Sequence, residues 1–151
     1  MTPVELDFAL FALDIMPAAL GIDEEPMWVQ SDRNIKELEG LLERPFQKYA
    51  GKELYKTPAE KTAVLFFETI KGHKFENGNK RTAVVLALAL LRRNGYWLKM
   101  SSDEMYKLAL KTAEGENNQK AQEKLNKIFA DRIERASLIG VFESWFKTFW
   151  K

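Results

Sequence analysis

Residues 80–94 read KRTAVVLALALLRRN, and this stretch decides the fold. Residues 83–91 are all apolar, so a helix formed here has no polar face to present to water. Other helices must therefore surround it. Arg92 and Arg93 near its end and Gly95 beyond it are typical of a helix C-terminus, because cations offset the negative end of the helix dipole. We expect the central helix of an all-α bundle.

A second helix is predicted immediately upstream. Thr57 is a good N-cap, Pro58 suits the first helical position, and Glu60 can return a hydrogen bond to the cap. Apolar residues then follow at the i, i+3, i+4, i+7 spacing of one buried face. Gly72 is expected to take the left-handed closing conformation, which ends this helix just before His73.

Further helices are expected on both sides of this pair. Ser101 and Glu104 form another capping box, and Gly115 is a stop signal for the helix that they begin. The predicted helices are 4–20, 34–43, 101–115, 121–133 and 138–150. Residues 45–56 lack helical periodicity and are predicted to form an extended loop or a small hairpin.

Length and composition indicate one compact domain over residues 1–151, with 46% hydrophobic residues for its core. The net charge of +1 provides no global field that would draw the protein onto nucleic acid or anionic lipid. The chain has no cysteine, which excludes disulfides and thiol chemistry. The first twenty residues contain three carboxylates and no Lys or Arg, unlike a secretory signal. We expect a cytoplasmic protein that binds neither membrane nor nucleic acid directly.

The residues that open the central helix are suited to binding phosphate. Asn79 is expected to cap the helix and to leave the amides of residues 80–82 unpaired, where the helix dipole favours anions. Lys80 and Arg81 add full positive charges, and arginine can bind phosphate oxygens in a bidentate fork. Gly78 allows a ligand to approach the backbone closely. Together these residues are predicted to grip a phosphate chain.

His73 is the only histidine of the chain and precedes this phosphate grip. A neutral histidine can accept a proton at cellular pH, as transfer of a phosphorus-centred group to a hydroxyl requires. Phe75 is expected to be buried beneath the loop and to hold His73 and Asn79 in register. A lone histidine at a helix end is usually structural. Its coincidence with a helix stop, a glycine, two cations and a buried helix favours an active site.

Residues 73–83, HKFENGNKRTA, resemble the signature loop of the Fic/Doc family, His-x-Phe-x-(Asp/Glu/Asn)-x-Asn-(Gly/Lys)-Arg. The similarity continues at residues 40–45, 53–55, 59–61 and 102–115, and it is strongest to Doc-type (death-on-curing) toxins. The resemblance implies an all-helical bundle with a small flap before the motif helix. This agrees with the irregular segment 45–56.

The resemblance also implies roles for individual residues. His73 corresponds to the general base, Lys80 and Arg81 to residues that act on the nucleotide phosphates, and Asn77 to the magnesium position. The implied nucleotide-binding residues are Phe75, Gly78, Asn79, Lys80 and Arg81. ATP and Mg²⁺ are the implied cofactors, and the target is a hydroxyl of a protein. Lysine at the position of Lys80 is typical of Doc-like members. These members resemble protein kinases that phosphorylate the translation factor elongation factor Tu, and an antitoxin protein silences them.

Two departures from the family pattern leave alternatives open. Asn77 is neutral where many members have a carboxylate, so Mg²⁺ would be held more weakly, or partly by nucleotide phosphates and Glu76. Val84 replaces a second arginine found in members that transfer AMP. AMP transfer and a nucleotide-binding module with little catalysis therefore remain alternatives to phosphate transfer.

Two further segments have more than one interpretation. Some members of the family are silenced by an inhibitory segment with the pattern (Ser/Thr)-x-x-x-Glu-(Gly/Asn). Residues 112–117 fit this pattern, although a helix end at Gly115 explains them better. The aromatic residues between 142 and 150 could form an antitoxin or dimer surface, although aromatics at helical spacing are more often core.

Overall fold

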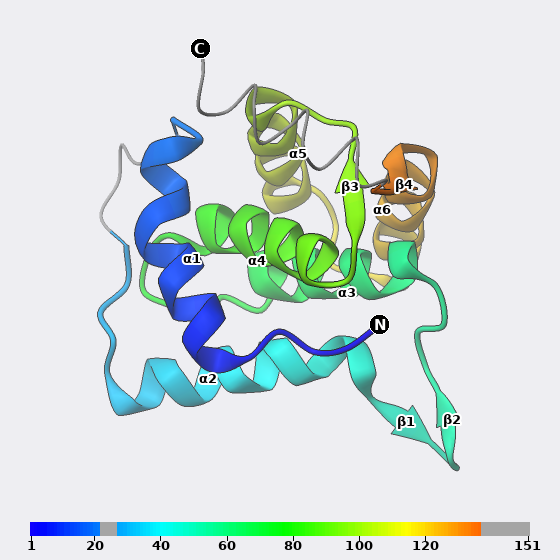
Figure 1. Cartoon of the computed structure of the whole chain (residues 1–151), viewed down its shortest axis with the longest axis horizontal. Helices are drawn as coiled ribbons and strands as arrows, with labels where there is room; N and C mark the ends of the chain where they lie inside the picture. Colours follow the sequence, from blue (N-terminus) through cyan, green and yellow to red (C-terminus); the bar gives the residue numbers. More distant parts are fainter. Residues whose placement is uncertain (22–26, 137–151) are drawn as a thin grey trace.

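The computed structural model describes residues 1–21 and 27–136. Within these ranges the chain forms six α-helices, one short 3-10 helix and two small antiparallel sheets, so the predicted all-α bundle is confirmed (Figure 1). The elements are α1 (Leu6–Ala19), α2 (Asp32–Glu43), η1 (Arg44–Phe46), β1 (Lys48–Tyr49), β2 (Lys52–Glu53), α3 (Pro58–Lys71), α4 (Asn79–Arg93), β3 (Tyr96–Leu98), α5 (Ser102–Glu114), α6 (Gln119–Arg132) and β4 (Ile133–Arg135). None of the described helices combines the length and apolarity needed to cross a membrane. The helix predicted over 138–150 lies outside the described residues.

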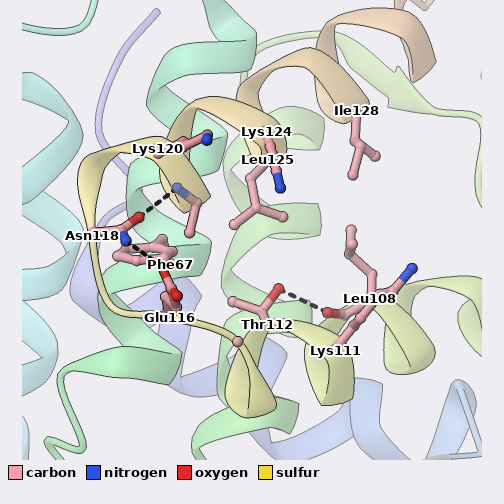
Figure 2. Close-up of a pocket in the computed structure, with 12 residues that line it drawn as sticks. Phe67, Leu108, Lys111, Thr112, Glu116, Asn118, Lys120, Lys124, Leu125 and Ile128 are labelled. Atoms are coloured by element: carbon pink, nitrogen blue, oxygen red, sulfur yellow. Dashed lines mark hydrogen bonds between the residues drawn. The ribbon is translucent and has the colours of Figure 1, made fainter.

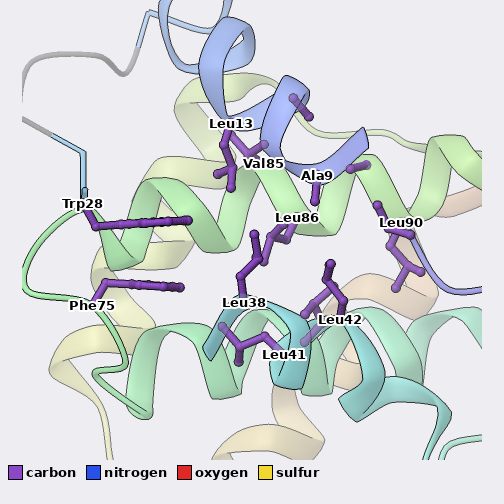
Figure 3. Close-up of a cluster of buried hydrophobic side chains, with 14 residues drawn as sticks. Ala9, Leu13, Trp28, Leu38, Leu41, Leu42, Phe75, Val85, Leu86 and Leu90 are labelled. Carbon is purple, nitrogen blue, oxygen red and sulfur yellow. The ribbon is translucent and has the colours of Figure 1, made fainter. Parts of the chain in front are cut away.

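Helix α4 lies in the middle of the described bundle (Figure 1), and most of its side chains are buried. Its two faces belong to different core clusters. Val85, Leu86 and Leu90 pack with side chains of α1 and α2 (Figure 3). Val84 and Ala87, on the opposite face, pack with α3, α5 and α6. Burying a Val or Leu side chain stabilises a fold by about 1.5–3 kcal/mol, so this helix accounts for much of the core energy.

The helix starts predicted at Thr57 and Ser101 are confirmed, with one adjustment at Thr57. The Thr57 hydroxyl accepts a hydrogen bond from the Glu60 amide at 3.1 Å. The Glu60 carboxylate accepts from the Lys56 amide at 2.8 Å, one residue before the expected partner. At α5 the capping box between Ser101 and Glu104 is complete in both directions.

Residues 45–56 contain the small hairpin that the sequence allowed, with β1 paired to β2 and positive φ angles at Ala50 and Gly51. The hairpin precedes α3, whereas the motif loop follows it. A 14-residue helix is about 20 Å long, so hairpin and loop lie at opposite ends of α3 (Figure 1).

Lys61 fastens the hairpin segment to α3. Its side chain is 3% exposed, and its ammonium group donates to the Glu53 carboxylate at 3.2 Å and to the Pro45 carbonyl at 3.3 Å. It also donates to the carbonyl of Tyr55 and lies 5.0 Å from the centre of the Phe46 ring. A buried ammonium needs such partners, because an unpaired buried charge is very costly.

Replacing Lys61 by Met should release the hairpin and destabilise the protein by about 1–3 kcal/mol, because two carbonyls and a carboxylate lose their donor. The measurement is hydrogen exchange of the amides of residues 46–56 together with denaturant unfolding. Lys56→Met, at an exposed lysine of the same segment, is the control. Equal exchange rates in the two variants would contradict the anchoring role.

The N-terminal segment is attached to the C-terminal end of α4. The Arg93 guanidinium donates to both carboxylate oxygens of Glu5, with the shortest contact at 2.7 Å. These hydrogen bonds lower the pKa of Glu5 from 4.5 to about 2. Nearby, the Asn94 amide group donates to the Thr2 carbonyl at 2.9 Å.

Because the pKa of Glu5 is lower in the folded protein, the stabilisation by Arg93 is present above the ordinary carboxyl pKa and is lost as the pH falls toward 2. The melting temperature of Glu5→Gln should therefore lie below that of the original protein at pH 6, and the difference should disappear near pH 2. The difference should be small, because both side chains are exposed. Glu39→Gln, at an exposed residue of α2, is the control. A difference that stays constant with pH would contradict this assignment.

Candidate active site

The motif loop begins with a strained histidine. The sequence placed the left-handed residue at Gly72, and this prediction is wrong: Gly72 has φ −73°, whereas His73 has φ +46°. Glycine is required at position 72 for a different reason. A Cβ there would lie 2.5 Å from the carbonyl oxygen of Glu68. His73 is exposed and forms no hydrogen bond with another described residue.

Asn79 closes the loop instead of capping the helix, which corrects a second prediction. Its side chain accepts a hydrogen bond from the Phe75 amide at 3.2 Å and donates to the Phe75 carbonyl at 2.9 Å. The N-cap is Gly78, in the left-handed conformation with φ +73°. The amide of Thr82 donates to the Gly78 carbonyl at 2.9 Å, so it is not one of the unpaired amides. Among the described residues, no backbone partner faces the amides of Asn79 and Lys80.

Phe75 is buried beneath the loop, as predicted, with 4% of its surface exposed. Its ring stacks on Trp28 with 4.3 Å between ring centroids and 7° between planes. The indole of Trp28, which Figure 3 shows beside the Phe75 ring, donates to the Thr82 hydroxyl on α4 at 3.0 Å. Gly78 is also buried, and a Cβ on it would come within 3.0 Å of the Met27 sulfur. The segment after residue 26 therefore supports both the loop and the helix start.

The middle of the loop is attached to α2. Asn34, fully buried, donates to the Glu76 carboxylate at 3.2 Å, and Arg33 lies 3.6 Å from the same carboxylate. A hydrogen bond from its own backbone amide, and then the one from Asn34, lower the pKa of Glu76. Lys74 forms an ion pair with Glu37 at 3.6 Å. These contacts direct Glu76 toward α2.

The magnesium position offers few ligands. Asn77 is exposed and contributes one neutral amide oxygen. No group of three or more His, Asp or Glu residues within the described ranges is arranged to hold a metal ion. The Glu76 carboxylate, considered as a second ligand, is bound to Asn34. A hard cation here would depend mainly on oxygen atoms of a bound ligand.

A cavity of about 350 Å³ lies beside the first turn of α4. Arg81 lines it, and α1 and the segment 27–30 supply the remaining walls. Arg81 is 4% exposed as a residue, whereas Lys80 is partly exposed. Asp14 also lines the cavity and lowers its positive potential. The two predicted cations thus differ in their surroundings: Lys80 is partly exposed and Arg81 is enclosed.

The arrangement combines an exposed proton acceptor, unpaired amides at a helix start and two cations on that helix. Free amides and positive charge at a helix N-terminus bind anions. An exposed imidazole can accept a proton from an incoming hydroxyl. The predicted residues 73–81 are thus brought together in one loop and one helical turn.

Three supporting residues were missed by sequence reasoning. Trp28, Asn34 and Met27 contact the loop or the helix start, yet all three lie more than forty residues upstream. No local pattern in the sequence marked these residues, because a single sequence does not show which distant segments pack together.

Comparison of the sequence with known proteins identifies one matching protein family. Residues 17–91 match the model of the Fic/DOC family, from the end of α1 to nearly the end of α4. No significant match was found among curated proteins or among solved structures. The matched region contains the motif loop and most of the residues that hold it in place.

Asn79→Ala should destabilise the protein by about 1–3 kcal/mol, because the partly buried amide and carbonyl of Phe75 both lose their partner. Asn79→Asp should cost less, since it keeps the acceptor for the Phe75 amide. Urea unfolding of the two variants measures the difference. Equal stability of Asn79→Ala and the original protein would show that these hydrogen bonds do not hold the loop.

Proposed function

The chain belongs to the Fic/DOC family, and from this premise we propose that it is a Doc-like enzyme that transfers phosphate from ATP to a hydroxyl of a protein. Members of this family are generally nucleotide-dependent transferases that modify proteins. The proposed target is a translation factor such as elongation factor Tu, so the enzyme would act in the cytoplasm and inhibit growth. An antitoxin protein would keep it silent.

One observation carries the proposal: His73 and the start of α4 lie at the two ends of a single loop that Asn79 closes onto Phe75. This closure fixes residues 75–79, and in the proposal it holds the proton acceptor, two residues before Phe75, in a defined relation to the phosphate grip. Such positioning is the main contribution that a protein makes to phosphoryl transfer. The roles of Phe75 and Gly78 in nucleotide binding are indirect in this proposal, because both are buried and shape the loop.

The proposed reaction uses few groups. A ring nitrogen of His73 takes the proton of the target hydroxyl while the oxygen of that hydroxyl bonds to the γ-phosphorus. The bond from the γ-phosphorus to the bridging oxygen breaks, and ADP leaves with that oxygen. The amides of Asn79 and Lys80 and the charges of Lys80 and Arg81 stabilise the negative charge on the phosphate oxygens.

Magnesium fits this site only in part. Asn77 supplies a single neutral oxygen, and Glu76 is engaged with α2. In the proposal, Mg²⁺ would be held by Asn77 together with the nucleotide phosphates. Protein cations then carry most of the charge compensation, so no step above is assigned to the metal.

Two other functions are alternatives to phosphate transfer. In AMP transfer the target oxygen would instead bond to the α-phosphorus, and the bond from that phosphorus to the oxygen bridging to the β-phosphorus would break. Whether phosphate or AMP is transferred depends on how the triphosphate lies against Lys80. Members with glycine at that position transfer AMP, so Lys80 favours phosphate transfer. The neutral Asn77 favours a second candidate, a nucleotide-binding module with little catalysis.

Incubating the protein with bacterial lysate and ATP labelled at the γ or the α phosphate separates these functions. We expect γ label on a protein of the lysate, and a loss of at least a hundredfold in His73→Ala, since a general base contributes about 10²–10⁴ in rate. Lys127→Gln, at an exposed lysine of α6, is the control and should retain transfer.

The outcomes distinguish the candidates. Label from the α phosphate would establish AMP transfer and contradict the kinase proposal. ATP binding without any label that depends on His73 would support the binding module.

A further inference from the structure

A second cavity lies between α5 and α6, away from the motif loop. Both helices pack on α3 but barely contact each other, which leaves a space of about 510 Å³ between them (Figure 2). Phe67 of α3, itself 5% exposed, lines this space. Leu125 and Ile128 point from α6 toward Leu108 of α5. None of the residues that line it belongs to the motif loop, so the cavity is separate from the proposed site.

Three lysines surround this apolar interior. Lys111 comes from α5, whereas Lys120 and Lys124 come from α6. None of the three forms an ion pair with a described residue, although Lys107 of α5 does. The amine of Lys124 lies over the gap between the helices (Figure 2). Unpaired ammonium groups beside apolar side chains give the cavity a distinct amphipathic, cationic character.

Glu116 is the single carboxylate in the lining, and it is already engaged. It accepts a hydrogen bond from the Asn118 amide group at 2.7 Å. Asn118 in turn accepts from the Ala121 amide at 2.9 Å and so caps α6. Three positive charges against one negative charge leave the lining with a surplus of two positive charges, which favours an anion.

The loop between α5 and α6 closes one end of the cavity (Figure 2). This loop is held in place by Lys71, whose ammonium donates to the Ala113 carbonyl at 2.8 Å and to the carbonyl of Gly115. A helix of a partner protein would need a groove that continues at both ends. A space closed at one end, with a volume in the usual range for ligand pockets, suits a small molecule better.

We propose that this cavity binds a small amphipathic anion, with an aliphatic or aromatic body and one carboxylate. The body would contact Phe67, Leu125 and Ile128 and leave water, and the carboxylate would pair with Lys111 and Lys124 at the rim. An uncharged apolar molecule would leave the ammonium groups without a partner. A small hydrophilic anion would leave the apolar walls exposed to water.

The test measures binding of decanoate to the full chain by calorimetry, with decanol and acetate as comparison ligands. Decanoate should bind saturably and more tightly than either. Lys111→Gln and Lys124→Gln should each weaken binding about two- to fivefold, because partly exposed ion pairs contribute modestly. Lys127→Gln, at an exposed lysine of α6 outside the lining, should not change it.

A second pair of variants tests the apolar contact. Ile128→Asp should weaken decanoate binding at least tenfold, because a carboxylate would then stand in the cavity wall. Leu110→Asp is the matched control, since Leu110 is 37% exposed and lies outside the lining, whereas Ile128 is 38% exposed. Circular dichroism should confirm that both variants remain folded.

Three results would overturn the proposal. Equal binding of decanol and decanoate would show that the lysines do not recognise the anion. Equal effects of Ile128→Asp and Leu110→Asp would place the ligand elsewhere. Failure of decanoate to bind, with binding of an acidic amphipathic peptide that depends on Lys124, would assign the groove to a protein partner. Because the readout is binding, none of these results depends on the transferase activity.

Discussion

The burial of α4 on all sides is the constraint on which the rest of the structure depends. A helix with no solvent face must be enclosed by other elements, and here α1 and α2 cover one side while α3, α5 and α6 cover the other. Its side chains are buried from residue 81 to residue 91, apart from the partly buried Leu88. Solvent therefore meets this helix at its two ends, and at the first turn the backbone amides of Asn79 and Lys80 have no described partner. The polar groups of the candidate site therefore lie at the N-terminal end of the most apolar helix.

The loop before α4 stores strain at the residue proposed to react. A non-glycine residue in the left-handed region costs of order 1 kcal/mol or more, although histidine tolerates it better than most. Such a conformation persists only where the surroundings fix it. Here the Gly72 amide donates to the Glu68 carbonyl at 2.9 Å, and Phe75 is held by both Asn79 and Trp28. His73 is thus positioned by the residues around it, since its own side chain has no described hydrogen bond.

Within the described residues, the sequence was sufficient to predict the helices and the loop, and insufficient to predict the contacts that shape the loop. Helix starts at Thr57 and Ser101 follow from local capping chemistry, which is encoded within four residues. The left-handed residue was misassigned because glycine is the usual choice there, whereas glycine at position 72 avoids a clash that a Cβ would make with a carbonyl one turn earlier. Asn79 was misassigned for a similar reason: an asparagine before a helix usually caps it, but its side chain can also close a loop upstream. The stacking of Trp28 on Phe75 depends on chain topology, which no local pattern contains.

Charge balance connects these structural details to the proposed chemistry. A carboxylate at position 77 would add negative charge beside a bound polyphosphate and would require a metal ion to compensate it. This chain has a neutral Asn77, and the neighbouring Glu76 is diverted to Asn34 and Arg33. The first turn of α4 therefore keeps its positive potential, which attracts a polyphosphate without help from a cation. The absence of a carboxylate at position 77 also removes a ligand that would fix the metal and align the phosphates. In the proposed reaction, nucleotide binding and precision of transfer would thus respond in opposite directions to the residue at position 77, and a carboxylate introduced there would favour alignment at the expense of the site's own attraction for phosphate.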